Sequence, residues 1–239
     1  MELVHLFTCV VAGPSGSEKS VWVSRFLENS RALCTVQFDR VLVYYAEWQE
    51  AYAREFQLPR GPEVKFREGL SDPVDYSHNP EEKKLLILDD LMREGCTEVV
   101  ANLVSRGLDH KNSSVLYLTQ NIFHQGKCSR DISLNAKYIV LFKSPQDRNQ
   151  IRHLAQQVYP EDTRFVREAF PNATAKPHIY LFFDLTQSTS DKLRFRAFYA
   201  YVPKISKVSS IELETGFLVY PLDSGQNIVS LHRAMAAKS

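Results

Sequence analysis

A glycine-rich segment near the amino terminus contains residue types that bind phosphate. The segment Gly13-Pro14-Ser15-Gly16-Ser17-Glu18-Lys19-Ser20 matches the pattern G-x-x-x-x-G-K-[ST] except at the second glycine, which is Glu18. In such loops backbone N–H groups at a helix start hold the phosphates, the lysine contacts the β and γ phosphates, and the serine hydroxyl binds Mg²⁺. The pattern therefore predicts a nucleotide site that uses Lys19 and Ser20. The alternative is a Gly/Ser turn that binds nothing.

Glu18 is the departure from this pattern, and it opposes phosphate binding. A carboxylate about 4 Å from a phosphate oxygen costs about 1 kcal/mol in water and about 4 kcal/mol at an effective dielectric constant near 20. A positive φ at this position would also disfavour any residue other than glycine. We therefore expect Glu18 to weaken nucleotide binding.

Two carboxylates and an amide follow later apolar runs. Asp89 and Asp90 come directly after residues 85–88, and Gln120 follows residues 114–119. At the carboxyl edge of a parallel sheet, Asp89 would hold Mg²⁺ through water, and Asp90 would act as general base toward an attacking water. Gln120 would lie beside them and sense the γ-phosphate, or it would cap the following loop; the spacing leaves both readings open.

A basic run lies between residues 127 and 152, where six cations face only two carboxylates. Such an excess in a chain with 29 basic and 28 acidic residues suits a phosphate backbone. The alternative is a solvated basic face. The candidate DNA-binding residues are Lys127, Lys143, Arg148 and Arg152. Arg130 is instead a candidate arginine finger, which would reach the site of a neighbouring subunit.

The elements that must position these residues alternate between strands and helices. Residues 6–12, 40–46, 85–88, 114–119 and 138–142 are apolar runs without alternation, which predicts buried parallel strands with helices on both faces. Helical periodicity follows near residues 21–27, 47–56, 97–108, 151–158 and 161–170, the last ending at Pro171. Residues 178–185 and 193–202 predict a hairpin at the sheet edge.

The domain organisation expected from this pattern is one domain at residues 1–203, followed by a weakly patterned tail or small appendage at residues 204–239. Residues 57–83 read as a polar, Pro-containing excursion.

Composition excludes several classes of protein. Hydrophobic residues make up 44% of the chain and charged residues 24%, which excludes wholesale disorder. The four cysteines form no C-x-x-C pair, so a zinc ribbon or disulfide framework is not indicated. No apolar run approaches the roughly 18 to 20 residues needed to span a bilayer. We expect an intracellular protein without a membrane partner.

Longer segments resemble one family. They are FTCVVAGPSGSEKSVWVSRFL, LLILDDL, SVLYLTQNIFHQGKCSRDISLNAKYIVLFKSPQDRNQI and IYLFFDLTQSTSDKLRFRAF, and they lie within residues 4–202. Together they resemble the genome-packaging ATPases of Polinton (Maverick) transposons and adintoviruses, in the FtsK/HerA division of P-loop ATPases. Lys19, Ser20, Asp89, Asp90 and Gln120 fall on the family's nucleotide site.

The resemblance implies an α/β, RecA-like P-loop fold in three layers, with ATP and Mg²⁺ as cofactors. It also implies a homo-oligomeric ring that pumps double-stranded DNA into a capsid, a capsid vertex protein as a further partner, and a host nucleus or cytoplasmic virus factory as location. Two alternatives remain open. One is a catalytically inactive relative that keeps the fold and the oligomer, and the other is a P-loop nucleotide kinase.

Overall fold

The computed structural model describes residues 3–56, 62–69, 81–89, 91, 112–123, 132–175, 179–189 and 194–199, together with the backbone of three short strands between residues 211 and 230. The chain divides into two compact units, residues 1–137 and residues 138–239. The glycine-rich loop, Asp89 and Gln120 all belong to the first unit.

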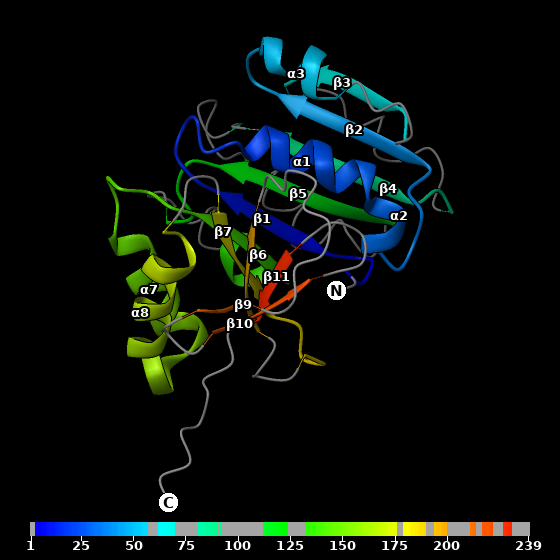
Figure 1. The fold of residues 1–239 in the computed structure, drawn as a ribbon. Helices are drawn as coiled ribbons and strands as arrows, with labels where there is room; N and C mark the ends of the chain where they lie inside the picture. The colour runs from blue at the N-terminus through cyan, green and yellow to red at the C-terminus, as the bar shows by residue number, and fades with distance from the viewer. Residues whose placement is uncertain are drawn as a thin grey trace, which may run out of the picture. The chain divides into compact units, whose positions relative to one another are not determined.

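Five strands form a parallel sheet in the first unit, in the order β3-β2-β4-β5-β1 (Figure 1). Their bounds are β1 (Thr8–Ala12), β2 (Arg40–Tyr45), β3 (Val64–Glu68), β4 (Lys84–Asp89) and β5 (Ser113–Thr119). Every residue of β1, β4 and β5 is buried, which explains why these segments lack alternation. The parallel pairing predicted for residues 6–12, 40–46, 85–88 and 114–119 is confirmed, whereas the pairing of β6 (Tyr138–Phe142) with β7 (Ile179–Asp184) is antiparallel.

The register of the sheet brings three strand ends to one edge. Asp89 pairs with Leu118, and Ala12 pairs with Thr119, so β4, β5 and β1 end at the same level. The strand that leads to Gln120 thus lies between the strand that leads to the loop and the strand that ends in Asp89. Ligands of open α/β sheets bind at this carboxyl edge.

Helix α1 (Lys19–Glu28) lies along one face of this sheet (Figure 1). Its buried face includes Trp22, Val23, Phe26 and Leu27, at the spacing expected of an amphipathic helix. The rings of Trp22 and Phe26 stack with centroids 5.5 Å apart. Helix α2 (Ser30–Leu33) follows at once, and α3 (Glu50–Glu55), which follows β2, contacts α1.

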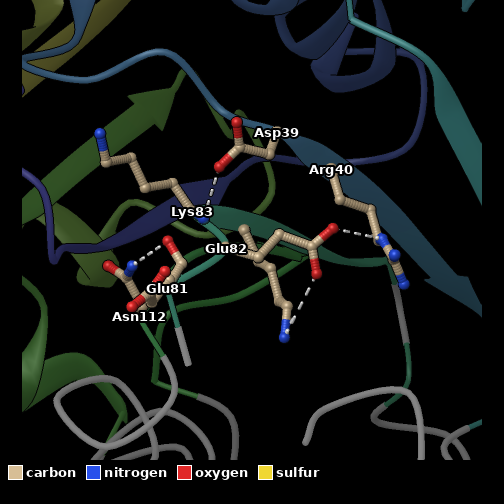
Figure 2. Close-up of polar contacts among 7 residues, drawn as sticks. Asp39, Arg40, Glu81, Glu82, Lys83 and Asn112 are labelled. Carbon is tan, nitrogen blue, oxygen red and sulfur yellow. Dashed lines mark hydrogen bonds and ion pairs between the residues drawn. The ribbon is translucent and has the colours of Figure 1, made fainter. Parts of the chain in front are cut away.

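A network of polar contacts fixes the opposite, amino-terminal edge of the sheet (Figure 2). Glu82 contacts Arg40 Nε at 2.8 Å and the buried Lys84 Nζ at 3.6 Å. The backbone N–H of Lys83 donates to the Asp39 carboxylate at 2.8 Å, and Asn112 donates to the Glu81 carbonyl at 3.1 Å. These contacts tie the start of β4 to the start of β2 and to the residue that precedes β5.

Strand β3 lies within residues 57–83, where the sequence predicts no element. It pairs with β2 at the edge of the sheet, and its residues are exposed or half-buried. An edge strand with one solvent-facing side lacks the continuous apolar run that marks the inner strands. For this reason the sequence pattern predicts no strand at these residues. The helix predicted over residues 97–108 lies outside the described residues.

The second unit contains a sheet in the order β6-β7-β8-β11-β10-β9, with every pair antiparallel. Its strands are β6 (Tyr138–Phe142), β7 (Ile179–Asp184), β8 (Phe195–Tyr199), β9 (Ile211–Leu213), β10 (Phe217–Pro221) and β11 (Asn227–Ser230). The helices are α7 (Asn149–Val158), the short 3₁₀ helix η3 (Pro160–Asp162) and α8 (Thr163–Ala173).

The hairpin predicted after residue 178 is present as β7 and β8. Asp184 closes it by accepting hydrogen bonds from the Thr186 hydroxyl at 2.7 Å and the Thr189 hydroxyl at 2.9 Å.

The predicted end of a helix at Pro171 was wrong, because α8 continues to Ala173. Pro171 lies in the last turn, where its missing N–H removes only one bond near the terminus. Three short strands also lie within residues 204–239; the boundary at residue 203 stays a prediction.

Candidate functional site

The loop between β1 and α1 contains two residues in the left-handed conformation. Gly16 has a φ of +75°, and Glu18, the N-cap of α1, has φ 68° and ψ 32°. Glycine adopts this conformation readily, whereas a side chain with a Cβ makes it cost roughly 1–2 kcal/mol. Glu18 therefore combines a left-handed backbone, which favours glycine, with a carboxylate side chain.

Lys19 folds back over the loop that precedes it. Its Nζ donates to the carbonyl oxygen of Gly13 at 2.7 Å and to that of Pro14 at 3.1 Å. The loop itself is tied to the sheet, because the Gly13 N–H donates to the Thr119 carbonyl at 3.1 Å. The Lys19 ammonium group is thus held beside the loop, next to the N-terminus of α1.

Ser17 carries a buried hydroxyl that no described residue hydrogen-bonds. A buried polar atom without a partner costs about 1–3 kcal/mol, and such atoms in a binding loop fit a ligand that supplies the missing bond. Phosphate oxygens accept hydrogen bonds, and the N-terminus of the ten-residue α1 favours an anion. The loop is therefore chemically suited to a phosphate group.

Asp89 is 5% exposed at the end of β4, and its Oδ2 accepts a hydrogen bond from the Tyr52 hydroxyl at 2.6 Å. Tyr52 lies on α3 and is 1% exposed. A hydrogen bond to an ionised acceptor is short and about twice as strong as a neutral one. Sequence reasoning missed this contact, because the two residues lie 37 positions apart on different elements.

Gln120 is exposed just beyond β5, and its neighbours hold the following turn. The Thr119 hydroxyl donates to the Asn121 carbonyl at 3.0 Å, and the Asn121 side-chain oxygen accepts from the Phe123 N–H at 2.8 Å. Thr119 and Asn121 therefore hold this turn together. Gln120 lies at the edge where β1, β4 and β5 end.

These elements enclose one cleft of about 310 Å³ in the first unit. Its lining residues are Ser15, Gly16, Ser17, Glu18, Lys19, Ser20, Val21, Gln49, Arg54, Asp89, Leu118, Thr119 and Gln120. The structure thus brings Ser20, Asp89 and Gln120 together with the loop. The sequence pattern did not predict Gln49 and Arg54 as residues of this cleft. The signal that could have identified them is that residues 47–56 directly follow a strand of the same sheet.

The cleft offers oxygen ligands for Mg²⁺ in Ser20 and Asp89. Hydroxyl and carboxylate oxygens are the groups that this hard cation prefers, with the rest of its shell supplied by water and phosphate. The residues present therefore fit both a nucleotide and its magnesium ion. Within the described parts of the chain, no cluster of three or more His, Cys, Asp or Glu residues forms another metal site.

Other predicted site residues lie elsewhere. Asp90, Lys127 and Arg130 are outside the described residues. Lys143 follows β6, while Arg148 and Arg152 lie at the N-cap and within α7; all three are exposed and belong to the second unit. Arg148 and Arg152 are four residues apart, which places them on one side of the helix.

Comparison with solved structures finds two neighbours of this chain. One is the genome packaging NTPase B204 from Sulfolobus turreted icosahedral virus 2 in complex with ATP-gammaS, with a TM-score of 0.50, 14% identity, and coverage of 77% of this chain and 94% of that chain. The other is the ATPase DotB of Legionella pneumophila, with a TM-score of 0.35, 11% identity, and coverage of 72% and 53%. The likeness to B204 shows that the fold is the α/β fold of P-loop NTPases, as predicted.

The sequence itself gives no further match. No protein-family model matches it. No curated protein matches it significantly. Among the described helices, none combines the length and apolar character needed to cross a bilayer.

Proposed function

We propose that this protein is an ATP-driven motor that translocates double-stranded DNA into a viral or transposon capsid. One observation carries the proposal: a single cleft gathers the loop at residues 13–20, Asp89 and Gln120 from three adjacent strand ends. The fold shared with the viral genome packaging NTPase B204, which was solved with ATP-gammaS, supports it. The family resemblance of residues 4–202 supports the packaging role.

The residues of the site have separate roles in the proposed hydrolysis. Lys19 would exchange the carbonyl oxygens of Gly13 and Pro14 for the β and γ phosphates. Ser20 and Asp89 would hold Mg²⁺, which when bound neutralises charge on the phosphates. Gln120 would orient the attacking water, and Asp90, outside the described residues, would accept its proton.

Assembly completes the proposed site. Hydrolysis in ring ATPases uses a positive charge delivered by a neighbouring subunit, worth about 10³ to 10⁵ in rate. Arg130 is the candidate for this finger, and a homo-oligomeric ring is the assembly that it requires. Mixing an Arg130→Ala subunit with a Lys19→Ala subunit should restore part of the activity that each lacks alone, whereas normal hydrolysis by Arg130→Ala would refute the assignment.

A second candidate is a relative that keeps the fold and the oligomer but has lost activity. The observation that favours it is Glu18, which combines a left-handed backbone with a carboxylate in the cleft. Calorimetry with MgATP separates the two candidates. The motor predicts measurable binding by the natural protein, and the impaired relative predicts binding only after Glu18→Gly.

Turnover assays complete the test. Duplex DNA should stimulate ATP hydrolysis by a motor, and Lys19→Ala should abolish hydrolysis in any background. Phosphoryl transfer to GMP or another nucleoside phosphate faster than transfer to water would instead support a kinase. No binding of ATP in either the natural protein or Glu18→Gly would refute the proposal.

A further inference from the structure

Helix α3 forms a wall of the cleft that the glycine-rich motif does not account for. Gln49, at its N-cap, and Arg54, in its last turn, both line the cleft. Between them lies Tyr52, which is buried and donates its hydroxyl hydrogen to Asp89. One short helix therefore contacts the site at three places.

The Tyr52 ring is held by other aromatic rings. Its centroid lies 5.5 Å from that of Trp48, 5.7 Å from those of Tyr45 and Phe66, and 5.9 Å from that of Phe56. Aromatic pairs at such separations stabilise each other beyond the effect of their burial. The packing fixes where the Tyr52 hydroxyl points, so the hydroxyl can act as a rigid donor.

Asp89 thereby has a fixed orientation. It is nearly buried, it receives the hydroxyl at Oδ2 from 2.6 Å, and it also lines the cleft. A carboxylate has two oxygens, and fixing one of them determines where the other can meet a ligand. Groups that orient a metal ligand in this way set metal affinity, and their removal typically lowers it by about 10- to 100-fold.

We propose that Tyr52 is a positioning residue for magnesium: by donating to Oδ2, it holds the Asp89 carboxylate in the orientation that binds hydrated Mg²⁺ with the nucleotide. This inference rests on the proposed ATPase function. The competing explanation is purely structural, in which the hydroxyl only satisfies a buried carboxylate. The two differ in what happens to metal dependence when the hydroxyl is removed.

The test measures the affinity for ATP by calorimetry, once with Mg²⁺ and once with EDTA. The proteins compared are the natural protein and Tyr52→Phe, and both are measured again with Glu18→Gly added. We expect Tyr52→Phe to bind ATP unchanged in EDTA and to need about 10- to 100-fold more Mg²⁺ for half-maximal strengthening of ATP binding. Tyr45→Phe is the matched control, because it removes a hydroxyl from the same aromatic cluster. It should leave the Mg²⁺ requirement unchanged.

A second variant tests whether Tyr52 acts through Asp89. In an Asp89→Asn background, Tyr52→Phe should cause no further change in the Mg²⁺ requirement. If Tyr52→Phe does not fold, 3-fluorotyrosine at position 52 preserves the ring, and its fluorine resonance should shift when Mg²⁺ is added to the ATP complex. If Tyr52→Phe binds ATP with an unaltered Mg²⁺ requirement, or if the fluorine resonance does not respond to Mg²⁺, the role of Tyr52 is overturned while the proposed ATPase function still stands. Absence of ATP binding in every background overturns the proposed function, and the assignment with it.

Discussion

Lys19 places its ammonium nitrogen 2.7 Å from the carbonyl oxygen of Gly13, six residues earlier in the same loop. The side chain is therefore already ordered over the loop, so phosphate binding exchanges one set of oxygen acceptors for another. Much of the side-chain entropy that a free lysine loses on binding has been lost in advance.

We predict that Lys19→Ala, made in a Glu18→Gly background, lowers MgATP affinity by about 10- to 100-fold and abolishes turnover. The expected loss follows from hydrogen bonds to a charged group, which contribute about 1.5–3 kcal/mol. Calorimetry and phosphate release measure the two effects. Lys65→Ala removes an exposed lysine on β3 and should leave both unchanged; a Lys19→Ala protein of full activity would falsify the phosphate-loop assignment.

Two substitutions separate the effects of charge and backbone at Glu18. Glu18→Gly removes the carboxylate and also the strain of a side chain at a φ of 68°. It should tighten MgATP binding by at least tenfold, about 1.4 kcal/mol. Glu18→Gln removes only the charge, so it should recover part of that gain. Thermal unfolding should show that Glu18→Gly is at least as stable as Glu18→Gln, because glycine tolerates a left-handed backbone. Equal affinities in all three proteins would show that Glu18 does not harm the site.

Arg54 provides a cation in the cleft that also contains Glu18. Its removal should weaken MgATP binding, but only by about 1 kcal/mol or less, because the side chain is exposed and its charge is screened. This corresponds to a factor of up to about five in the dissociation constant measured by calorimetry. Arg31→Ala, on the exposed side of α2, is the control and should have no effect. Identical losses in both variants would indicate a nonspecific effect of net charge.

The parts of this site that sequence could predict are local ones. The loop, the run that ends in Asp89 and the strand before Gln120 are short segments whose own patterns define them, and parallel pairing brings their ends together. The contact between Tyr52 and Asp89 depends on tertiary packing, which leaves no periodic signal in either segment. Strand β3 was missed for a related reason, since its residues are only partly buried at the sheet edge.

The His5 side chain makes stability depend on pH. Its Nε2 lies 2.8 Å from the Asn112 side-chain oxygen, so Nε2 carries the proton, and Nδ1 accepts from the Ser114 hydroxyl at 2.7 Å. Burial lowers the pKa of His5 below 6.5; Lys83 and Lys137 lower it further, although the hydrogen bond to Asn112 opposes the shift. The folded state therefore favours neutral His5.

We predict that the free energy of unfolding falls as pH drops through 6.5 toward the lower pKa of folded His5. In this window the unfolded chain binds more protons than the folded one, so stability is fully present above the window and decreases on acidification. Urea unfolding between about pH 5 and 8 measures the slope. His5→Gln should reduce the slope of the free energy of unfolding against pH. At the alkaline end, where His5 is neutral in both states, the difference in this free energy between the two proteins isolates the cost of the altered hydrogen bonds. An unchanged slope would assign the pH dependence to other groups.

The exposed cations of the second unit give a test of DNA binding. Lys143, Arg148 and Arg152 are all solvent-accessible, and a surface that contacts phosphates releases counterions when DNA binds. We predict binding to duplex DNA without sequence preference, with an affinity that falls steeply as salt rises. Replacing all three with alanine should reduce the slope of log affinity against log salt by up to about three, roughly one unit for each phosphate that is no longer neutralised.

The control for this experiment must change net charge equally. Replacing Arg31, Lys65 and Arg67, which are exposed in the first unit, removes the same three charges. If the basic run is the DNA surface, this triple variant should keep the natural salt slope, because only residues that neutralise phosphates release counterions. A reduced slope in the control and a natural slope in the Lys143, Arg148 and Arg152 variant would place the DNA surface on the first unit instead.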